Sequence, residues 1–161
     1  YRDSYEFMRY PATWDNVSNN IKRLIEALPK ADINFHFVVQ ALNVQHLIPT
    51  LDYCNLQRKT TRITNLVFPQ HLTWTVLTAT ERESIVQLLE QQKTEYRITA
   101  KQQAYVDNLC QTIKDSAYSD ADRQKFCSFV GRTVKHRQLG VCATNNHFNV
   151  LSTLAAQVLN T

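Results

Sequence analysis

The chain has 161 residues, of which 43% are apolar and 20% charged, and it carries a formal net charge of +4. This composition is too apolar for an intrinsically disordered chain and too often interrupted by charge for a membrane span, and the length allows one domain with a core. The lysines and arginines are scattered, whereas nucleic-acid-binding modules gather positive charge on one face, so binding to nucleic acid is the weakest function considered.

The first predicted helix covers residues 13–28. Thr13 can cap its start, Asp15 places a negative charge in the first turn, where it favours the helix dipole, and Pro29 ends it. Its apolar residues fall on one stripe at helical spacing, namely Val17, Ile21, Leu24, Ile25 and Leu28.

Two strands are predicted around a short second helix. Residues 33–39 alternate aromatic and β-branched side chains as a strand does, a helix follows around Pro49–Tyr53, and Arg62–Phe68 forms the second strand. A helical crossover between two strands makes a βαβ unit with parallel strands. Ligands of parallel sheets bind at the carboxyl ends of the strands, which are here Gln40–Asn43 and Phe68–His71.

The remainder of the chain is predicted to be helical. Thr80 and Glu83 have the spacing of a capping box, Ser119 with Asp122 can cap a later helix, and the glutamine-rich stretch 87–103 is expected to be a solvated helix face and its connection. The apolar stripes of these helices contain Val106, Leu109, Cys110 and Ile113, then Phe126, Phe129 and Val130, and finally Leu151, Leu154, Ala155 and Val158.

The cysteines and glycines exclude several kinds of site. The four cysteines, at positions 54, 110, 127 and 142, include no C-x-x-C pair that would direct two thiolates to one metal ion. We therefore expect free thiols in a reducing cytosol and no metal site in this chain. The two glycines cannot build a phosphate-binding loop, which excludes nucleotide fingerprints. His36 alternates with apolar neighbours and is expected to face the helices.

The start of the chain also carries information. The first residue is Tyr1, the only methionine is Met8, and no positively charged segment followed by an apolar run stands at the start. This pattern indicates an internal or C-terminal piece of a larger protein, located in the cytoplasm.

Over roughly residues 1–95, the sequence resembles a known family in the segments YEFMRYPATWDNVSNNIKRL, INFHFVVQALNVQHLIPTLDYC and TRITNLVFPQHLTWTVL. They are similar to the second half of radical S-adenosylmethionine (radical SAM) enzymes with a shortened, twitch-type C-terminal extension. The stretch FVGRTVKHRQLGV resembles the family's closing stretch more weakly. The resemblance implies an α/β fold, the C-terminal part of a partial (β/α)6 TIM-like barrel over residues 1–95, and a helical extension over residues 96–161.

In such a barrel, residues 5–28 would be the loop and helix after the fourth strand, and the two predicted strands would be the fifth and sixth. The resemblance further implies two cofactors, S-adenosylmethionine and a 4Fe-4S cluster held by a CxxxCxxC motif. That motif is absent from the sequence. The cluster ligands would therefore belong to the missing N-terminal half of the barrel, and the chain alone is expected to be inactive. The substrate, whether a peptide, a protein or a small molecule, is unknown.

The resemblance also implies roles for five residues. Arg9 would contact the carboxylate of S-adenosylmethionine, Gln40 and Asn43 its ribose or amino-acid part, and Leu66 and Val67 its adenine. Each has an alternative without a ligand: a structural arginine, a loop-capping asparagine and ordinary core residues. For the whole chain, the alternative to an enzyme fragment is a non-enzymatic α/β module for binding or assembly.

The chain by itself is predicted to bind no iron–sulfur cluster, because its cysteines are too far apart in sequence to share one loop. Anaerobic reconstitution with iron and sulfide should give the same absorbance in the charge-transfer region as a variant with all four cysteines changed to serine. A stable cluster, present in the natural sequence and lost in that variant, would contradict this expectation.

Overall fold

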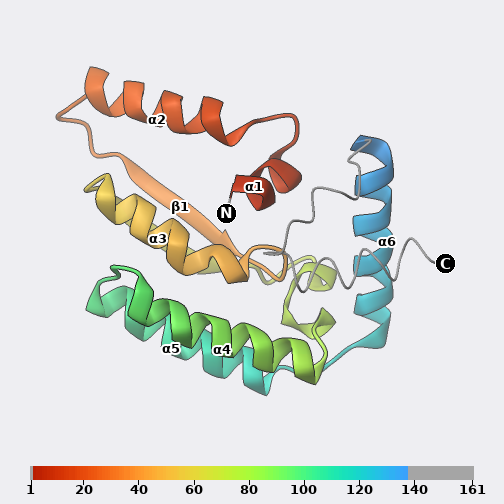
Figure 1. Ribbon diagram of the computed structural model, residues 1–161. Helices are drawn as coiled ribbons and strands as arrows, with labels where there is room; N and C mark the ends of the chain where they lie inside the picture. The colour runs from red at the N-terminus through yellow and green to blue at the C-terminus, as the bar shows by residue number, and fades with distance from the viewer. Residues whose placement is uncertain (1, 138–161) are drawn as a thin grey trace.

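The computed structural model describes residues 2–137, an α/β arrangement that is mostly helical with a small parallel sheet (Figure 1). In chain order the elements are α1 (Arg2–Arg9), α2 (Trp14–Ala27), β1 (Asn34–Val39), η1 (Val44–His46), α3 (Leu47–Leu56), β2 (Thr60–Asn65), η2 (Gln70–Leu72), η3 (Trp74–Val76), α4 (Ala79–Glu95), α5 (Ala100–Asp115) and α6 (Asp120–Arg137). The predicted α/β class is confirmed. The helix predicted around residues 151–158 lies outside the described residues.

The two strands pair in parallel, as the predicted βαβ unit requires. The register runs from Asn34 beside Thr60 to Val39 beside Asn65, and α3 makes the crossover. The second strand begins earlier than predicted and ends at Asn65, before Phe68. The reason is that β1 ends at Val39: its carbonyl still accepts a hydrogen bond from the Leu66 N–H at 2.8 Å, but no residue beyond it offers a partner.

The start of α2 is built as predicted, with one addition. Thr13 is the N-cap, and its hydroxyl oxygen accepts a hydrogen bond from the Asn16 N–H at 3.4 Å. A carboxylate oxygen of Glu6 accepts from the Trp14 N–H at 2.8 Å and so satisfies another free amide of the first turn. Glu6 belongs to α1, a helix that forms where a loop was expected.

The apolar stripe of α2 is poorly covered. None of its residues is buried, and among residues of the predicted stripe, Leu24 is 45% exposed and Leu28, directly after the helix, 51% exposed. A helix with a complete apolar stripe normally buries it against a neighbouring element. Within residues 2–137, α2 therefore lacks part of the packing for which its sequence is suited.

The core lies around α3, which is sandwiched between the sheet and α4 (Figure 1). Leu47, Ile48 and Leu51 of this helix are fully buried, and burial of each such side chain stabilises the fold by about 1.5–3 kcal/mol. The same cluster continues through α4, α5 and α6, with Ile85, Val86, Leu89, Val106, Leu109, Cys110, Ile113, Phe126 and Val130. Helices α5 and α6 thus share one core with the segment before residue 95.

Helix α6 is joined to α4 by an ion pair. Two guanidinium nitrogens of Arg123 donate to the two carboxylate oxygens of Glu81, at 2.8 and 3.0 Å, and one of them also donates to the Val76 carbonyl at 2.8 Å. This paired, parallel geometry is the strong form of the arginine–carboxylate contact. It docks α6 on the first turn of α4.

The capping box predicted at Thr80 and Glu83 is wrong. The box is formed by Thr78 and Glu81: the Thr78 hydroxyl oxygen accepts from the Glu81 N–H at 3.3 Å, and the Thr78 N–H donates to the Glu81 carboxylate at 2.8 Å. Both threonine–glutamate pairs have the same spacing, so sequence cannot separate them. Glu81 also forms the ion pair with Arg123 of α6, and this tertiary contact favours the box with Glu81 over the one with Glu83.

The glutamine-rich stretch 87–103 was expected to be solvated, but part of it is buried. The Gln92 side chain is buried and donates to the Gln45 carbonyl at 3.1 Å. Gln102 is also buried and completes a second capping box, with Thr99, at the start of α5. Two of the glutamines therefore bind the backbone inside the protein instead of facing water.

A matched pair of substitutions tests the position of the first capping box. Thr78→Ala is expected to lower the free energy of unfolding by about 1 kcal/mol, because it removes the hydroxyl that caps α4. Thr80→Ala should change it by less than about 0.5 kcal/mol, since Thr80 is exposed. Urea unfolding of both variants measures the difference; a larger loss for Thr80→Ala would place the cap where the sequence pattern first suggested.

Candidate functional site

Four of the five residues assigned to cofactor binding lie at one end of the sheet, and the fifth, Arg9, follows Met8, which contacts Gln40. Gln40 and Asn43 follow β1, while Leu66 and Val67 follow β2, and the parallel pairing brings these two segments to the same edge. Arg9 ends α1, which lies beside this end of β1 in Figure 1. We name this region, defined by these five residues, the carboxyl edge.

A methionine of α1 contacts the turn that follows β1. The side-chain amide nitrogen of Gln40, Nε2, donates to the sulfur of Met8 at 3.0 Å. The neighbouring Arg9 is exposed, and its guanidinium forms no ion pair with any of the described acidic side chains. The structural alternative for Arg9, a pair with a nearby acid, therefore has no support in the described part of the chain.

Asn43 has the geometry of the loop-capping alternative. Its side chain is 5% exposed, and its oxygen accepts a hydrogen bond from the Gln40 N–H at 2.9 Å. Its amide nitrogen donates to the Val38 carbonyl at 2.9 Å. Both ends of the side chain thus hold the turn after β1 and satisfy backbone groups that the sheet leaves free. In this arrangement Asn43 shapes the carboxyl edge and has little surface left for a ligand.

The segment after β2 presents apolar surface. Val67 is 81% exposed and the next residue, Phe68, is 79% exposed, whereas Leu66 is partly buried. The core alternative therefore does not describe Val67. Phe68 was not singled out from the sequence, because an aromatic residue at the end of an apolar run is typical of a buried core position. The adjoining exposed Val67 and Phe68 can hold a flat apolar group such as a purine.

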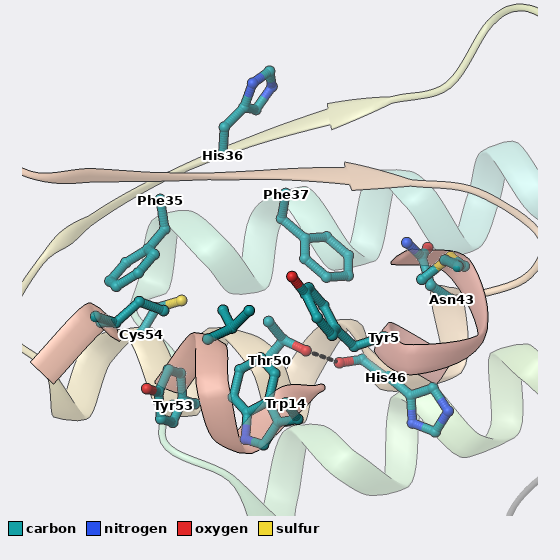
Figure 2. Close-up of a pocket in the computed structure, with 13 residues that line it drawn as sticks. Tyr5, Trp14, Phe35, His36, Phe37, Asn43, His46, Thr50, Tyr53 and Cys54 are labelled. Carbon is teal, nitrogen blue, oxygen red and sulfur yellow. Dashed lines mark hydrogen bonds between the residues drawn. The ribbon is translucent and has the colours of Figure 1, made fainter. Parts of the chain in front are cut away.

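An apolar cavity of about 180 Å³ lies under β1, between the strand and α1, α2 and α3 (Figure 2). Trp14 packs edge-on against Tyr5, with ring centroids 5.4 Å apart, and against Tyr53 at 5.3 Å. Phe35 and Phe37 of β1 point into the same space (Figure 2). The cavity is a continuation of the incomplete packing of α2, because residues of that helix line it.

The opposite face of the sheet is mostly polar, and four of its six residues are exposed. By alternation it carries Asn34, His36 and Val38 of β1 and Thr60, Arg62 and Thr64 of β2, and we call this set the open face. In Figure 2 the His36 side chain points away from Phe35 and Phe37. The expectation that His36 faces the helices is therefore wrong: its phenylalanine neighbours take the helix side, so the residue between them must take the other.

The described cysteines do not form a metal site. Cys54, Cys110 and Cys127 are free and come from three different helices, and Cys142 lies outside the described residues. Burial raises the pKa of the Cys54 thiol, against a smaller opposing effect of a hydrogen bond with Thr61, and burial raises that of Cys110 to about 11. Thiolates are the form that binds metals, so burial disfavours the ligating form of both residues.

Among the side chains that the structure describes, no group of three or more His, Cys, Asp or Glu is arranged to hold a metal ion. The ligand set of a 4Fe-4S cluster therefore does not fit the described part of the chain. The same residues contain no helix that is long and apolar enough to cross a membrane.

The buried Asn43 gives a direct test of this site. Asn43→Ala should lower the free energy of unfolding by about 1–3 kcal/mol, because a buried N–H and a carbonyl lose their partner. Gln40→Ala is the control and should cost less, since its side chain is only partly buried and contacts a thioether. Urea denaturation of the two variants decides; equal losses would mean that the Asn43 amide does not hold the turn.

Comparison with known proteins adds no family to this picture. No family model, no curated protein and no solved structure matches the chain. The function of the carboxyl edge and the open face must therefore be inferred from their own side chains.

Proposed function

We propose that this chain is the C-terminal part of a radical SAM partial barrel, with S-adenosylmethionine bound at the carboxyl edge and the cluster ligands on the N-terminal half of the barrel. The observation that carries the proposal is the one-sided covering of the parallel sheet. Helices pack on the face with Phe35 and Phe37, whereas Asn34, His36 and Arg62 of the other face are exposed.

One-sided covering distinguishes two kinds of parallel sheet. In doubly wound folds helices cover both faces, so the strands are apolar on both sides. In (β/α) barrels all helices lie outside, and the inner side chains face the interior and the carboxyl-end site. The polar open face fits the second kind, with His36, Arg62 and Thr64 lining the interior.

The incomplete packing of α2 supports a further strand next to β1. Within the described residues, β1 pairs only with β2, so its other edge is open. A preceding strand of the barrel at that edge would lie under α2 and cover Val17, Ile21 and Leu24, which are only partly buried or exposed. The proposed partner that supplies this strand is the N-terminal half of the barrel.

The side chains at the carboxyl edge suit the parts of S-adenosylmethionine unequally. Arg9 can donate two parallel hydrogen bonds to its carboxylate, and the exposed Val67 and Phe68 can cover its adenine. Gln40 can bind a polar group if it leaves Met8. Asn43 positions the turn instead of the ligand. The described residues bind and orient the cofactor in this proposal, and no step of radical formation is assigned to them because they offer no cluster ligands.

A second candidate, a non-enzymatic assembly module, rests on the same open strand edge and on the exposed Leu24 and Leu28. Both readings expect association with another chain segment. They differ in the cofactor: the assembly module has no need for an exposed arginine and an apolar surface at the same end of the sheet.

Arg9→Lys tests the proposal in the protein that also contains the upstream, cysteine-bearing half. Lysine keeps the charge but loses the planar fork, so binding of S-adenosylmethionine should weaken by about 1–3 kcal/mol. Arg132→Lys, at an exposed position of α6, is the matched control and should leave the affinity unchanged. Anaerobic calorimetric titration after cluster reconstitution gives both affinities.

The cluster content of the Arg9→Lys variant should equal that of the natural sequence, since its ligands lie elsewhere. Equal affinities for the cofactor in the two proteins would leave Arg9 as a surface residue. The protein that contains both this chain and the upstream, cysteine-bearing half is called the two-half protein. If it bound no S-adenosylmethionine, this result would refute the radical SAM assignment itself and favour the assembly module.

A further inference from the structure

The open face offers hydrogen-bond donors in one small area. His36 of β1 lies directly beside Arg62 of β2 in the register, and neighbouring strands are about 4.8 Å apart. A ring nitrogen of His36, Nε2, is 2.9 Å from the Thr64 hydroxyl. Arg62, His36 and Thr64 therefore form one cluster, in which Arg62 and His36 are exposed and Thr64 is partly buried.

This cluster presents a free donor whichever tautomer His36 adopts. If His36 Nε2 donates to Thr64, the hydroxyl hydrogen of Thr64 is free to donate outward. If Nε2 accepts from Thr64, the other ring nitrogen of His36 carries the hydrogen and is free to donate. In both cases a neutral donor stands beside the guanidinium of Arg62, which contributes several N–H groups and a permanent positive charge.

The charges around the cluster favour an anion. None of the six residues of the open face is an aspartate or a glutamate, and the guanidinium of Arg62 has no ion pair within residues 2–137. A single carboxylate nearby would have satisfied Arg62 and repelled an anionic ligand. A carboxylate or phosphate group, in contrast, accepts several charge-assisted hydrogen bonds at such a place.

We propose that Arg62, His36 and Thr64 bind an oxyanion carried by the substrate, so that this protein acts on an anionic substrate whose carboxylate or phosphate group rests on the open face. This inference depends on the proposed function, because only in a barrel does the open face line a substrate cavity. It assigns a substrate class, which the resemblance alone does not imply, and a binding role to three residues that point away from the core.

Equilibrium dialysis with radiolabelled inorganic phosphate and, separately, radiolabelled acetate at fixed ionic strength tests the site. The measurement is made on the chain alone and on the protein with its cysteine-bearing half. We expect saturable binding of one of the two anions, at one per chain, and the preferred anion identifies phosphate or carboxylate as the recognised group.

Arg62→Gln should weaken this binding about tenfold or more, because it removes the charge. Thr64→Val should weaken it several-fold while keeping the shape of the side chain, and Arg132→Gln on α6 should leave it unchanged. Circular dichroism confirms that each variant keeps its helices. Equal binding by the natural sequence and Arg62→Gln, or no saturable binding of either anion in both preparations, would overturn the proposal.

The two proposals fail in different ways. A two-half protein that binds S-adenosylmethionine but neither anion would refute the oxyanion site and leave the radical SAM assignment intact. Anion binding that depends on Arg62 in a protein that binds no S-adenosylmethionine would refute the assignment, and with it the barrel cavity from which the substrate class is inferred.

Discussion

The parallel pairing of β1 with β2 is the constraint on which the rest of this structure depends. Parallel strands cannot be joined by a tight turn, so the chain has to cross from one end of the sheet to the other. The crossover helix α3 is apolar enough to be buried between the sheet and α4, and its burial organises the core. Because both strands end at the same edge, the polar turn after β1 and the apolar segment after β2 meet there, and the proposed cofactor site follows from that meeting.

Much of the fold was predictable from local signals. Thr13 and Pro29 set the limits of α2. Alternation from residue 33 to 39 predicted β1, which begins at Asn34, and Ser119 caps α6 by accepting a hydrogen bond from the Asp122 N–H at 3.2 Å. Each signal acts over a few residues, so no tertiary information is needed to read it. What failed depended on partners distant in sequence: Arg123 selects one of two equivalent capping boxes, and the end of β1 decides where β2 stops.

For the candidate site, the sequence predicted which segments meet at the edge of the sheet but not the contacts of their side chains. The parallel topology that the sequence predicts is present, and it brings the segments after the two strands to one edge of the sheet. Tertiary contacts decide which side chains at the carboxyl edge are available to a ligand. The Asn43 side chain forms hydrogen bonds with two backbone groups, while Phe68 is exposed to solvent. His36 shows a further limit, since the same alternation that predicts a strand gives two faces, and only the packing of the helices decides which face is the inner one.

The capping boxes of α4 and α5, one at the start of each helix, have a consequence for how this protein folds. Both helices begin with a complete capping box, they are neighbours in sequence, and Lys93 reaches Asp107 across the pair at 2.6 Å. Contacts between neighbouring elements form in microseconds to milliseconds, whereas parallel strands must close a long loop before they gain any ladder hydrogen bond. The helical hairpin is therefore expected to be an early folding nucleus on which α3 docks, with the sheet, and the surfaces that it creates, completed last.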